Sequence, residues 1–484
     1  MNGDIELEIG LGPEPGSYEV RVISAAAGGS PSGTLILDVP DMLSKRDLLE
    51  ATVLASAVPR RAVSAAEQPV REVGRQLFQA LFAGPVYGMY RASLGAAQQR
   101  GKRLRVVLRL TAPELAALPW ETLFDPETET YLCRQEPLVR HVPAPYTADP
   151  LEVRPPLRIL GLVASPRDLP PLDIEAEKSH LAEALADPIA DGLVEVVWVP
   201  TATWAGVQTR LHAGEWHVLH FVGHGDYDTR TDEGLLALVG ADGQADLVEA
   251  GRLADLLGEA QPAPRLVMLN SCSSGQTGGN DVFSGTAATL VRSGISAVAA
   301  MQFAVSDTAA IAFARGFYSA IAHGRTVDEA ARSGRISILG APHSLEWLTP
   351  VLYVRGRATQ LFTMTPPEPG RQPPAQPPPA TEVPSTAITP PPPEVAKPPL
   401  ASTKTYETAR RTWAGLRAAY DGARAGGTSK PSPERGRRHG QASASETGWV
   451  ATSERFRDPT TGKIMRVWID PKDQSRHYVP EDNR

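Results

Sequence analysis

Two short apolar runs, each ending in small and polar residues, stand out in the pattern of hydrophobic and polar positions. They are WHVLHFVGHG at 216–225 and RLVMLNSCSSG at 265–275. Neither has the strict polar–apolar alternation of a half-exposed strand, and such runs are typical of strands at the centre of a parallel sheet covered on both faces. We therefore predict two buried strands, each followed by a polar loop.

Between residues 157 and 360, runs of strand length alternate with runs of helical spacing. A strand–helix–strand series favours a mostly parallel sheet with helices on both faces, so this region is predicted to be an α/β domain. A run at 235–239, followed by the turn ADGQ, is predicted to leave the main series as an excursion. The predicted strands are 157–164, 194–199, 216–222, 266–269, 296–301 and 351–354, and the predicted helices are 173–185, 204–212, 249–257, 283–292, 307–323 and 326–339.

The first 150 residues have a different pattern. Short alternating runs within 1–40, ending with Leu35-Leu37-Val39, predict a small antiparallel sheet, and residues 45–100 have helical spacing broken near three prolines. Strands are predicted at 105–110 and 131–142. We expect an N-terminal accessory α+β region over residues 1–150 and the α/β domain over 151–364.

The segment PWETLFD at 119–125 lies between those two strands. We expect Trp120 to pack in a core and Glu121 to cap an element. Cys133 is predicted to be a small buried hydrophobe, because no His–Gly pair accompanies it.

Composition changes beyond residue 364. From 366 to 400, 15 of 35 residues are proline, which predicts a semi-rigid linker over 365–402. Residues 403–484 are predicted to form a basic module, with a helix at 406–425 and a small β-hairpin or meander over 449–480; from residue 401 on there are 16 Lys and Arg against 10 Asp and Glu. Its ligand stays open between a protein partner and nucleic acid.

Charge and cysteine content narrow the class of protein. The net charge of −7 argues against nucleic-acid binding by the chain as a whole. Two cysteines, Cys133 and Cys272, exclude a disulfide framework and fit a reducing compartment. The sequence shows neither a secretory segment nor a stretch of about 20 apolar residues, so we expect a cytoplasmic protein without a membrane span.

His224 follows the first apolar run and Cys272 follows the second. In open α/β sheets the functional site lies outside the carboxyl ends of the strands. If the two strands are neighbours, both side chains reach the same edge, where an imidazole can take the thiol proton and the thiolate can attack a carbonyl. For either residue alone a structural role is the simpler interpretation, but together they favour catalysis.

An HG pair after a strand, followed 48 residues later by a cysteine that ends another strand, resembles the caspase-like cysteine peptidases. Within that clan the chain most resembles the bacterial CHAT-domain family, which is related to separase. The resemblance implies a caspase-like α/β sandwich with a mostly parallel central sheet, beside the N-terminal α+β region and the C-terminal β module. The matching stretches are 157–181, HFVGHG at 220–225, LNSCSSG at 269–275, 294–321 and TPVLYVRG at 349–356.

The resemblance also implies roles for individual residues. Cys272 would be the nucleophile and His224 the base, and the N–H groups of Gly225 and Cys272 would form the oxyanion hole. Asp226 and Asp228 are expected to be exposed loop acids rather than a third member that orients the histidine. We expect no cofactor and no metal ion.

Two residues are candidates for the pocket that receives the substrate side chain. Asn270 stands two positions before Cys272, where metacaspases carry an acidic residue. Asp307 lies in the sequence VSD, which is similar to the VTD segment of separase that meets an arginine. Asp307 is therefore a candidate acceptor for a basic side chain, or else, together with Ser306, an ordinary N-cap of the following helix.

These observations predict an intracellular cysteine endopeptidase with a His/Cys dyad. The resemblance implies regulated cleavage of a specific protein partner, after a basic residue, in bacterial signalling or defence, with an activating sensor or adaptor protein. The alternative is a catalytically silent caspase-like scaffold that acts through protein binding by its C-terminal module.

Overall fold

The computed structural model describes residues 3–14, 16–57, 67–228, 233–270, 282–340 and 344–365, and the strand segments 440–441, 450–457, 464–469 and 476–480. For residue 227, residues 282–284 and the segments beyond 439, only the backbone is described. The chain divides into two compact units, Met1–Arg417 and Ala418–Arg484. We describe each unit by itself.

Eleven strands of the described residues form one sheet in the first unit, in the order β10-β9-β11-β15-β16-β17-β7-β4-β1-β2-β3. Neighbours from β10 to β16 pair in parallel, as do neighbours from β17 to β1, and β16 and β17 are antiparallel. The predicted mostly parallel α/β sheet is therefore confirmed. The strands are β1 (Asp4–Leu11), β2 (Ser17–Ala25), β3 (Ser32–Ile36), β4 (Arg105–Leu110), β7 (Leu138–Val142), β9 (Leu157–Val163), β10 (Val194–Trp198), β11 (Val218–Val222), β15 (Leu266–Asn270), β16 (Ala297–Met301) and β17 (Pro350–Arg355).

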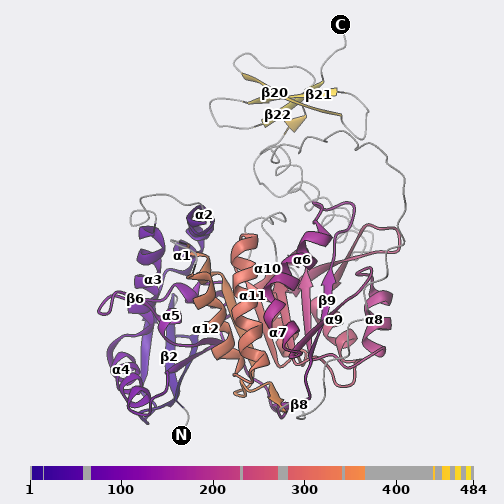
Figure 1. Ribbon diagram of the computed structural model, residues 1–484. Coiled ribbons are helices and arrows are strands. Elements are labelled where there is room, and N and C mark those ends of the chain that lie inside the picture. Colours follow the sequence, from indigo (N-terminus) through magenta and orange to yellow (C-terminus); the bar gives the residue numbers. More distant parts are fainter. Residues whose placement is uncertain are drawn as a thin grey trace. The chain divides into compact units, whose positions relative to one another are not determined.

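Helices cover both faces of this sheet. Figure 1 shows α6, α11 and α12 in front of it, and their buried residues belong to one apolar core, whereas those of α8 and α9 belong to the core of the other face. The helices are α1 (Val39–Ser44), α2 (Arg46–Ser56), α3 (Gln68–Leu81), α4 (Gly84–Gln99), α5 (Leu132–Gln135), α6 (Ile174–Ala184), α7 (Ala186–Ala190), α8 (Trp204–His212), α9 (Ala250–Leu257), α10 (Val282–Arg292), α11 (Asp307–Ala322) and α12 (Val327–Ile338), with short 3-10 helices η1 (Pro113–Leu115), η2 (Trp120–Thr122) and η3 (Glu346–Leu348).

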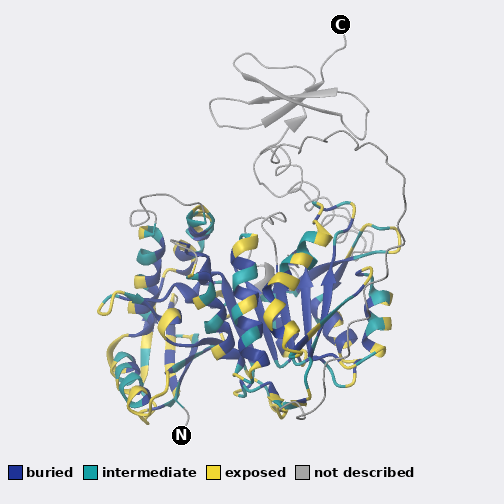
Figure 2. Ribbon diagram, viewed as in Figure 1, coloured by how far each residue is buried: buried dark blue, intermediate teal, exposed yellow. Residues whose placement is uncertain are grey.

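The position of β11 in the sheet explains why its sequence is continuously apolar. Successive side chains of a strand point to opposite faces. Leu219 and Phe221 enter the core on the α8–α9 side, and Val218 enters the core on the α11–α12 side. Every residue of β11 is buried, and Figure 2 shows the strands in the half of the large sheet that contains β9 and β11 largely in dark blue. Both faces of this strand are covered, as the apolar run predicted.

The N-terminal residues join the same sheet. Strands β1, β2 and β3 pair antiparallel, as the alternating pattern predicted. Two local predictions are wrong. Val39 begins α1, because Asp38 caps that helix by accepting the Asp41 N–H at 2.9 Å. The run at 131–142 is not one strand, because α5 and Pro137 separate β6 (Thr130–Tyr131) from β7. The division proposed at residue 150 stays a prediction, and the sheet continues across it.

A buried ion pair ties β7 to its surroundings. Glu121 was predicted to cap an element, and this prediction is wrong. Its carboxylate accepts from Arg140 Nη2 at 2.5 Å and from Nε at 3.2 Å, with both side chains almost fully buried. Arg140 also donates to the carbonyl of Ala116 and to the hydroxyl of Tyr353 on β17. Trp120 is fully buried, as expected.

The predicted excursion after β11 is a separate three-stranded sheet of β12 (Gly225–Asp228), β13 (Glu233–Val239) and β14 (Ala245–Glu249). A Cβ on Gly234 would lie 2.5 Å from Thr286 Cα, so glycine at this position lets α10 pack closely on β13. Two further strand pairs are β5 (Phe124–Asp125) with β6, and β8 (Leu151–Val153) with β18 (Phe362–Met364). No helix in the described ranges is both long and apolar enough to cross a membrane.

In the second unit, strands β19 (Gly440–Gln441), β20 (Val450–Arg457), β21 (Ile464–Ile469) and β22 (Arg476–Pro480) form a sheet in the order β19-β22-β21-β20. Strands β20, β21 and β22 are joined antiparallel in sequence order. The assignment of residues 403–484 as a separate basic module stays a prediction. The predicted helix at 406–425 and all but the first residue of the predicted linker at 365–402 lie outside the described residues.

Candidate functional site

Strands β11 and β15 are neighbours and run in parallel, with Val222 opposite Asn270. This confirms the expectation on which the predicted site depended. The chain leaves both strands at the same edge of the sheet, and His224 and Cys272 each follow two residues later. Cys272 lies outside the described residues, so its pairing with His224 stays a prediction.

His224 is oriented by a backbone carbonyl. The side chain is buried, and its Nε2 lies 2.8 Å from the carbonyl oxygen of Pro170. Because a carbonyl only accepts, Nε2 carries the hydrogen, and in the neutral ring the lone pair is on Nδ1. Pro170 precedes another proline, which favours an extended backbone, and the Leu172 N–H donates to Ser165 Oγ at 2.9 Å in the same loop. The β9–α6 loop thereby sets the tautomer of the imidazole.

Burial keeps this histidine neutral. It lowers the pKa of His224 below the ordinary 6.5, against a smaller opposite effect of the hydrogen bond to Pro170. Desolvation disfavours the imidazolium, so the ring is uncharged at neutral pH. An uncharged imidazole is the form that a general base requires.

Gly225 presents its backbone N–H away from its sheet. The Ala237 N–H donates to the His224 carbonyl at 3.0 Å, and Gly225 is opposite Leu236. Pairs alternate along an antiparallel ladder between hydrogen-bonded and non-hydrogen-bonded, so Gly225 belongs to a non-hydrogen-bonded pair and its N–H points away from β13. Strand β12 is an edge strand of its sheet. The N–H of Gly225 therefore does not pair with β13, and its role in an oxyanion hole stays a prediction.

The two acids after the histidine were predicted to be exposed loop residues, and this prediction is wrong. Asp226 and Asp228 lie in β12, and Asp228 is buried. The orienting partner of His224 is the Pro170 carbonyl, which no side-chain pattern could reveal.

The other cysteine is a small buried residue, as predicted, and His220 is a buried residue of β11. Cys133 is fully buried, its Sγ donates to the Glu121 carbonyl at 3.1 Å, and burial raises its thiol pKa to about 11. His220 is buried on β11 and hydrogen-bonds the Tyr318 hydroxyl at 2.8 Å. Neither has the properties of a reactive group.

The two candidate specificity residues line one small cavity between α6, α11 and the end of β15. Asn270 and Asp307 both contribute to it, with Glu177 and His180 from α6 and with apolar walls of Leu181, Ala310, Ile311 and Ala314. Its volume is about 20 Å³. Asn270 forms the last position of β15, so the cavity lies next to the edge where His224 and position 272 emerge.

Asp307 is not the cap of its helix. Ser306 is the N-cap of α11, with its hydroxyl accepting from the Ala309 N–H at 3.3 Å, and Asp307 is the first helical residue. The capping interpretation is therefore correct for Ser306. Asp307 is exposed and lines the cavity, and its role as the acceptor for a basic side chain stays a prediction.

Sequence reasoning did not single out Glu177 and His180. Their spacing of three residues places both on one face of α6, which the helical pattern after Asp173 could have shown. Their proximity to Asp307, 127 positions beyond His180, depends on the packing of α6 on α11, where Arg315 and Glu183 also lie 3.5 Å apart.

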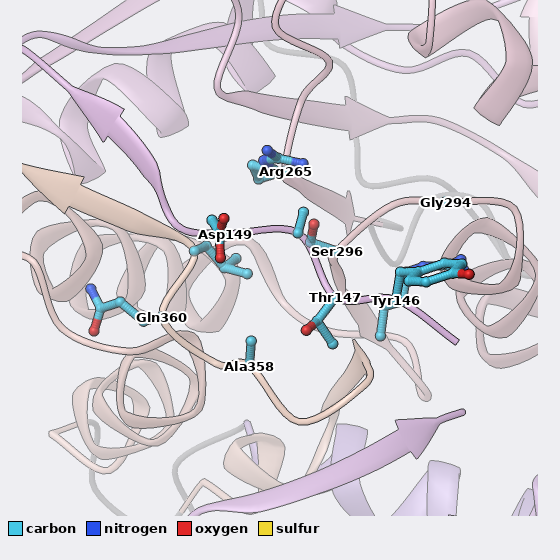
Figure 3. Close-up of a pocket in the computed structure, with 11 residues that line it drawn as sticks. Tyr146, Thr147, Asp149, Arg265, Gly294, Ser296, Ala358 and Gln360 are labelled. Carbon is cyan, nitrogen blue, oxygen red and sulfur yellow. The ribbon is translucent and has the colours of Figure 1, made fainter. Parts of the chain in front are cut away.

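A larger pocket lies at the opposite edge of the sheet. Its volume is about 260 Å³, and Figure 3 shows Asp149, Arg265 and Ser296 among its lining residues. Arg265 and Ser296 directly precede β15 and β16, whereas the predicted site follows β11 and β15. Of the predicted site residues that the structure describes, His224, Gly225, Asn270 and Asp307, none lines this pocket.

Comparison with known proteins assigns the family. The chain is an α/β protein with a buried histidine beyond a central parallel strand. The CHAT domain profile matches residues 71–417, most of the chain, and the chain therefore belongs to the CHAT domain family. The match begins within the predicted accessory region. No curated protein matches the chain.

Among solved structures, two crystal structures of the Saccharomyces cerevisiae separase–securin complex are similar. The identities are 11% and 12%, with TM-scores of 0.42 and 0.39. Each similarity covers 73% of this chain but 30% of the other, so the chain spans under a third of that length.

Proposed function

We propose that the chain is a cysteine endopeptidase in which His224 is the general base and Cys272 the nucleophile. The observation that carries the proposal is the parallel pairing of β11 with β15, which brings positions 224 and 272 to one edge of the sheet. The neutral tautomer of His224 is held by Pro170 with Nδ1 as the basic atom. In the proposed mechanism the imidazole takes the thiol proton, and the thiolate adds to the substrate carbonyl.

The oxyanion that forms in this step would be stabilised by the N–H groups of Gly225 and Cys272. The Gly225 N–H is directed away from its sheet, which supports this role. Donors placed at an oxyanion typically contribute about 3–4 kcal/mol each in the transition state. Collapse of the tetrahedral adduct would release the amine with the proton from His224, and water would then hydrolyse the acyl-enzyme.

The substrate would be a protein cleaved after Arg or Lys, with the Asp307 carboxylate and the Asn270 side chain in the receiving pocket. The cavity has room for about one water molecule, which needs about 10–15 Å³, so a guanidinium enters only if the pocket widens. Glu177 and His180 are only half-buried, so we expect the pocket to widen at these two side chains. The finer role, regulated cleavage in the cytoplasm for bacterial signalling or defence after activation by a partner, rests on the resemblance.

The test is a peptide-library cleavage assay on wild type, Cys272→Ala and His224→Ala, with labelling by an electrophilic thiol probe. We expect both substitutions to lower cleavage by at least about 10³-fold, because the nucleophile and its base act as a unit. Asp307→Asn should lower the preference for Arg or Lys over neutral residues by about 10–100-fold, because it removes a charge-assisted pair.

The matched control is Cys133→Ala, which removes the other thiol of the chain and should leave cleavage unchanged. Cleavage that persists in Cys272→Ala would contradict the proposal. A wild type that neither cleaves nor reacts with the probe, even with candidate activators added, would favour the silent scaffold that acts through the C-terminal module.

A further inference from the structure

The cavity beside the predicted site has the side chains of a metal site. We propose that Glu177, His180 and Asp307 bind a divalent transition-metal ion, with Zn²⁺ as the best fit. One ligand atom from each of the three side chains lies within 4.8 Å of the other two. Bonds of about 2.0–2.2 Å to one ion place tetrahedral ligands about 3.5 Å apart, so rotations of about 1 Å complete the geometry.

The local structure explains why the three side chains meet. Asp173 caps α6 by accepting the Ala176 N–H at 3.0 Å, and the helix then presents Glu177 and His180 three residues apart on one face. Ser306 caps α11 and leaves the Asp307 carboxylate for the cavity. The ligands therefore stand on two helices that already pack against each other.

Asn270 provides an independent indication of a ligand. Its side chain lines the same cavity and is only 8% exposed, and its Oδ1 accepts no hydrogen bond from any residue that the structure describes. A buried acceptor without a donor typically costs about 1–3 kcal/mol. A cation in the cavity, or a water bound to it, would give this oxygen a partner.

Charge and size favour a small cation. The lining includes two carboxylates and no Lys or Arg. The amino-terminal end of α11 contributes a partial charge of about +0.5, which is smaller than the charge of the two carboxylates. The volume of about 20 Å³ fits one water-sized particle and not an organic group.

The kinds of ligand atom select the metal. Mg²⁺ and Ca²⁺ prefer sites made only of oxygen, whereas an imidazole nitrogen with carboxylate oxygens suits Zn²⁺ and its neighbours. Three protein ligands leave a fourth position for water. Glu177 is joined to His180 by the spacing Glu-x-x-His, which also presents metal ligands in helical bundles.

A consequence for peptide cleavage rests on the proposed function. Asp307 would serve either the ion or the basic side chain of a substrate, but not both at once. Zn²⁺ bound at Glu177, His180 and Asp307 would therefore inhibit cleavage competitively with a basic peptide and would leave the sheet unchanged.

The test is a calorimetric titration of the full-length chain carrying Cys272→Ala with Zn²⁺ alone. This background removes the predicted nucleophile, so binding is measured without any contribution from its thiolate. We expect one ion per chain, and affinity at least about tenfold weaker in His180→Ala, Glu177→Gln and Asp307→Asn, because each removes a ligand. With Co²⁺ as the probe, the visible spectrum should show ligand-field bands that vanish with His180→Ala.

The matched control is His212→Ala. His212 Nε2 lies 3.0 Å from Glu259 on the surface, a histidine–carboxylate pair that is not part of a three-ligand group among the described residues. Binding should be unchanged in this variant. The proposal would be overturned if Zn²⁺ did not bind stoichiometrically, or if the three ligand variants bound it as tightly as the Cys272→Ala background does. Loss of binding in His212→Ala would also overturn it.

Two comparisons keep these outcomes separate from other failures. Cooperative thermal unfolding of each variant without metal establishes that the variant is folded. If His180→Ala is not folded, the isosteric variant Glu177→Gln still tests the site. If Zn²⁺ binds as expected but wild type cleaves no peptide, only the proposed function fails. If wild type cleaves peptides but Zn²⁺ does not bind, only the metal site fails.

Discussion

Three histidines of the His-bearing segment are held neutral by burial, each with its own partner. His217 Nδ1 accepts from the Arg158 N–H at 2.8 Å, His220 bonds Tyr318, and His224 bonds Pro170. Burial lowers the pKa of His217 and of His220 to about 4, and lowers that of His224 in the same direction. These three histidines, on β11 and directly beside it, therefore have lowered pKa values only while the protein is folded.

This makes stability sensitive to acid. Below pH 6.5 the unfolded chain protonates His220, whereas the folded chain does so only near pH 4. The unfolded state then binds more protons, so the free energy of unfolding falls as pH is lowered through this window, by on the order of 3 kcal/mol for this residue. Urea unfolding of wild type at pH values from 7 to 4 measures the effect.

His220→Gln, which cannot titrate at this position, should reduce this pH dependence, and the contribution of His217 should remain. His323→Gln is the matched control, because His323 is exposed and its Nδ1 bonds only the Ser319 carbonyl of its own helix. An identical pH dependence in wild type and His220→Gln would show that His220 is not the responsible group.

At the scale of elements, the start of α11 is fixed by a carboxylate from η3. Glu346 is buried and accepts from the Ser306 N–H at 2.6 Å, from the Ser306 hydroxyl at 3.0 Å and from the Ser344 hydroxyl at 3.0 Å. Ser306 in turn caps the helix, and Asp307 follows it. The position of the candidate specificity residue thus depends on a segment 40 residues away in sequence.

Glu346→Ala should lower the free energy of unfolding by about 3 kcal/mol, because hydrogen bonds to a charged acceptor contribute about 1.5–3 kcal/mol each and the Ser306 N–H loses its partner. Ser344→Ala removes only one of these bonds and should cost about 1 kcal/mol. Denaturant unfolding of the two variants measures both. Equal losses would mean that the cap does not depend on Glu346.

Capping residues and hydrophobic spacing made the helices and strands predictable from the sequence. Where such local signals are missing, the predicted bounds are less accurate. Helix α8 was predicted with the observed bounds, because Thr203 caps it by accepting the Gly206 N–H at 3.0 Å and helical spacing follows. The bound of β11 was less accurate, since Trp216 is apolar but precedes the strand. Sequence patterns report what a chain does over a few residues.

The site was predictable only in part, for the same reason. The rule that parallel strands share a carboxyl edge made it possible to predict that His224 and Cys272 follow neighbouring strands, and the structure confirms that β11 and β15 are neighbours. The Pro170 carbonyl has no side-chain signature, because any residue carries one. The meeting of His180 with Asp307 required knowing which helices pack against each other, which a single sequence does not specify.

At the scale of the molecule, the predicted accessory region and the α/β domain share one sheet. Strand β7 lies between β17 and β4, and Arg140 on β7 bonds both Glu121 and Tyr353. Removing residues 1–150 would uncover the whole edge of β17, with its unpaired backbone groups.

A chain that begins at residue 151 should therefore be insoluble or lack cooperative unfolding. A chain that ends at residue 365 keeps every strand of the large sheet and should unfold cooperatively. Soluble yield and thermal unfolding by near-ultraviolet circular dichroism compare the two. Cooperative unfolding of residues 151–484 alone would establish the boundary at residue 150 as that of an independent domain.

The pairing of β7 with β17 also has a consequence for protein synthesis, because the ribosome completes the two strands at different times. The hydrogen bond between Arg140 and Tyr353 spans 213 residues. Ribosomes add about 5–20 residues per second, so about 10–40 s separate the emergence of the two strands. Over that interval a growing polypeptide carries β7 with one edge uncovered, and such edges invite association with other chains. Translation speed and chaperone supply are therefore expected to govern how much protein a cell obtains.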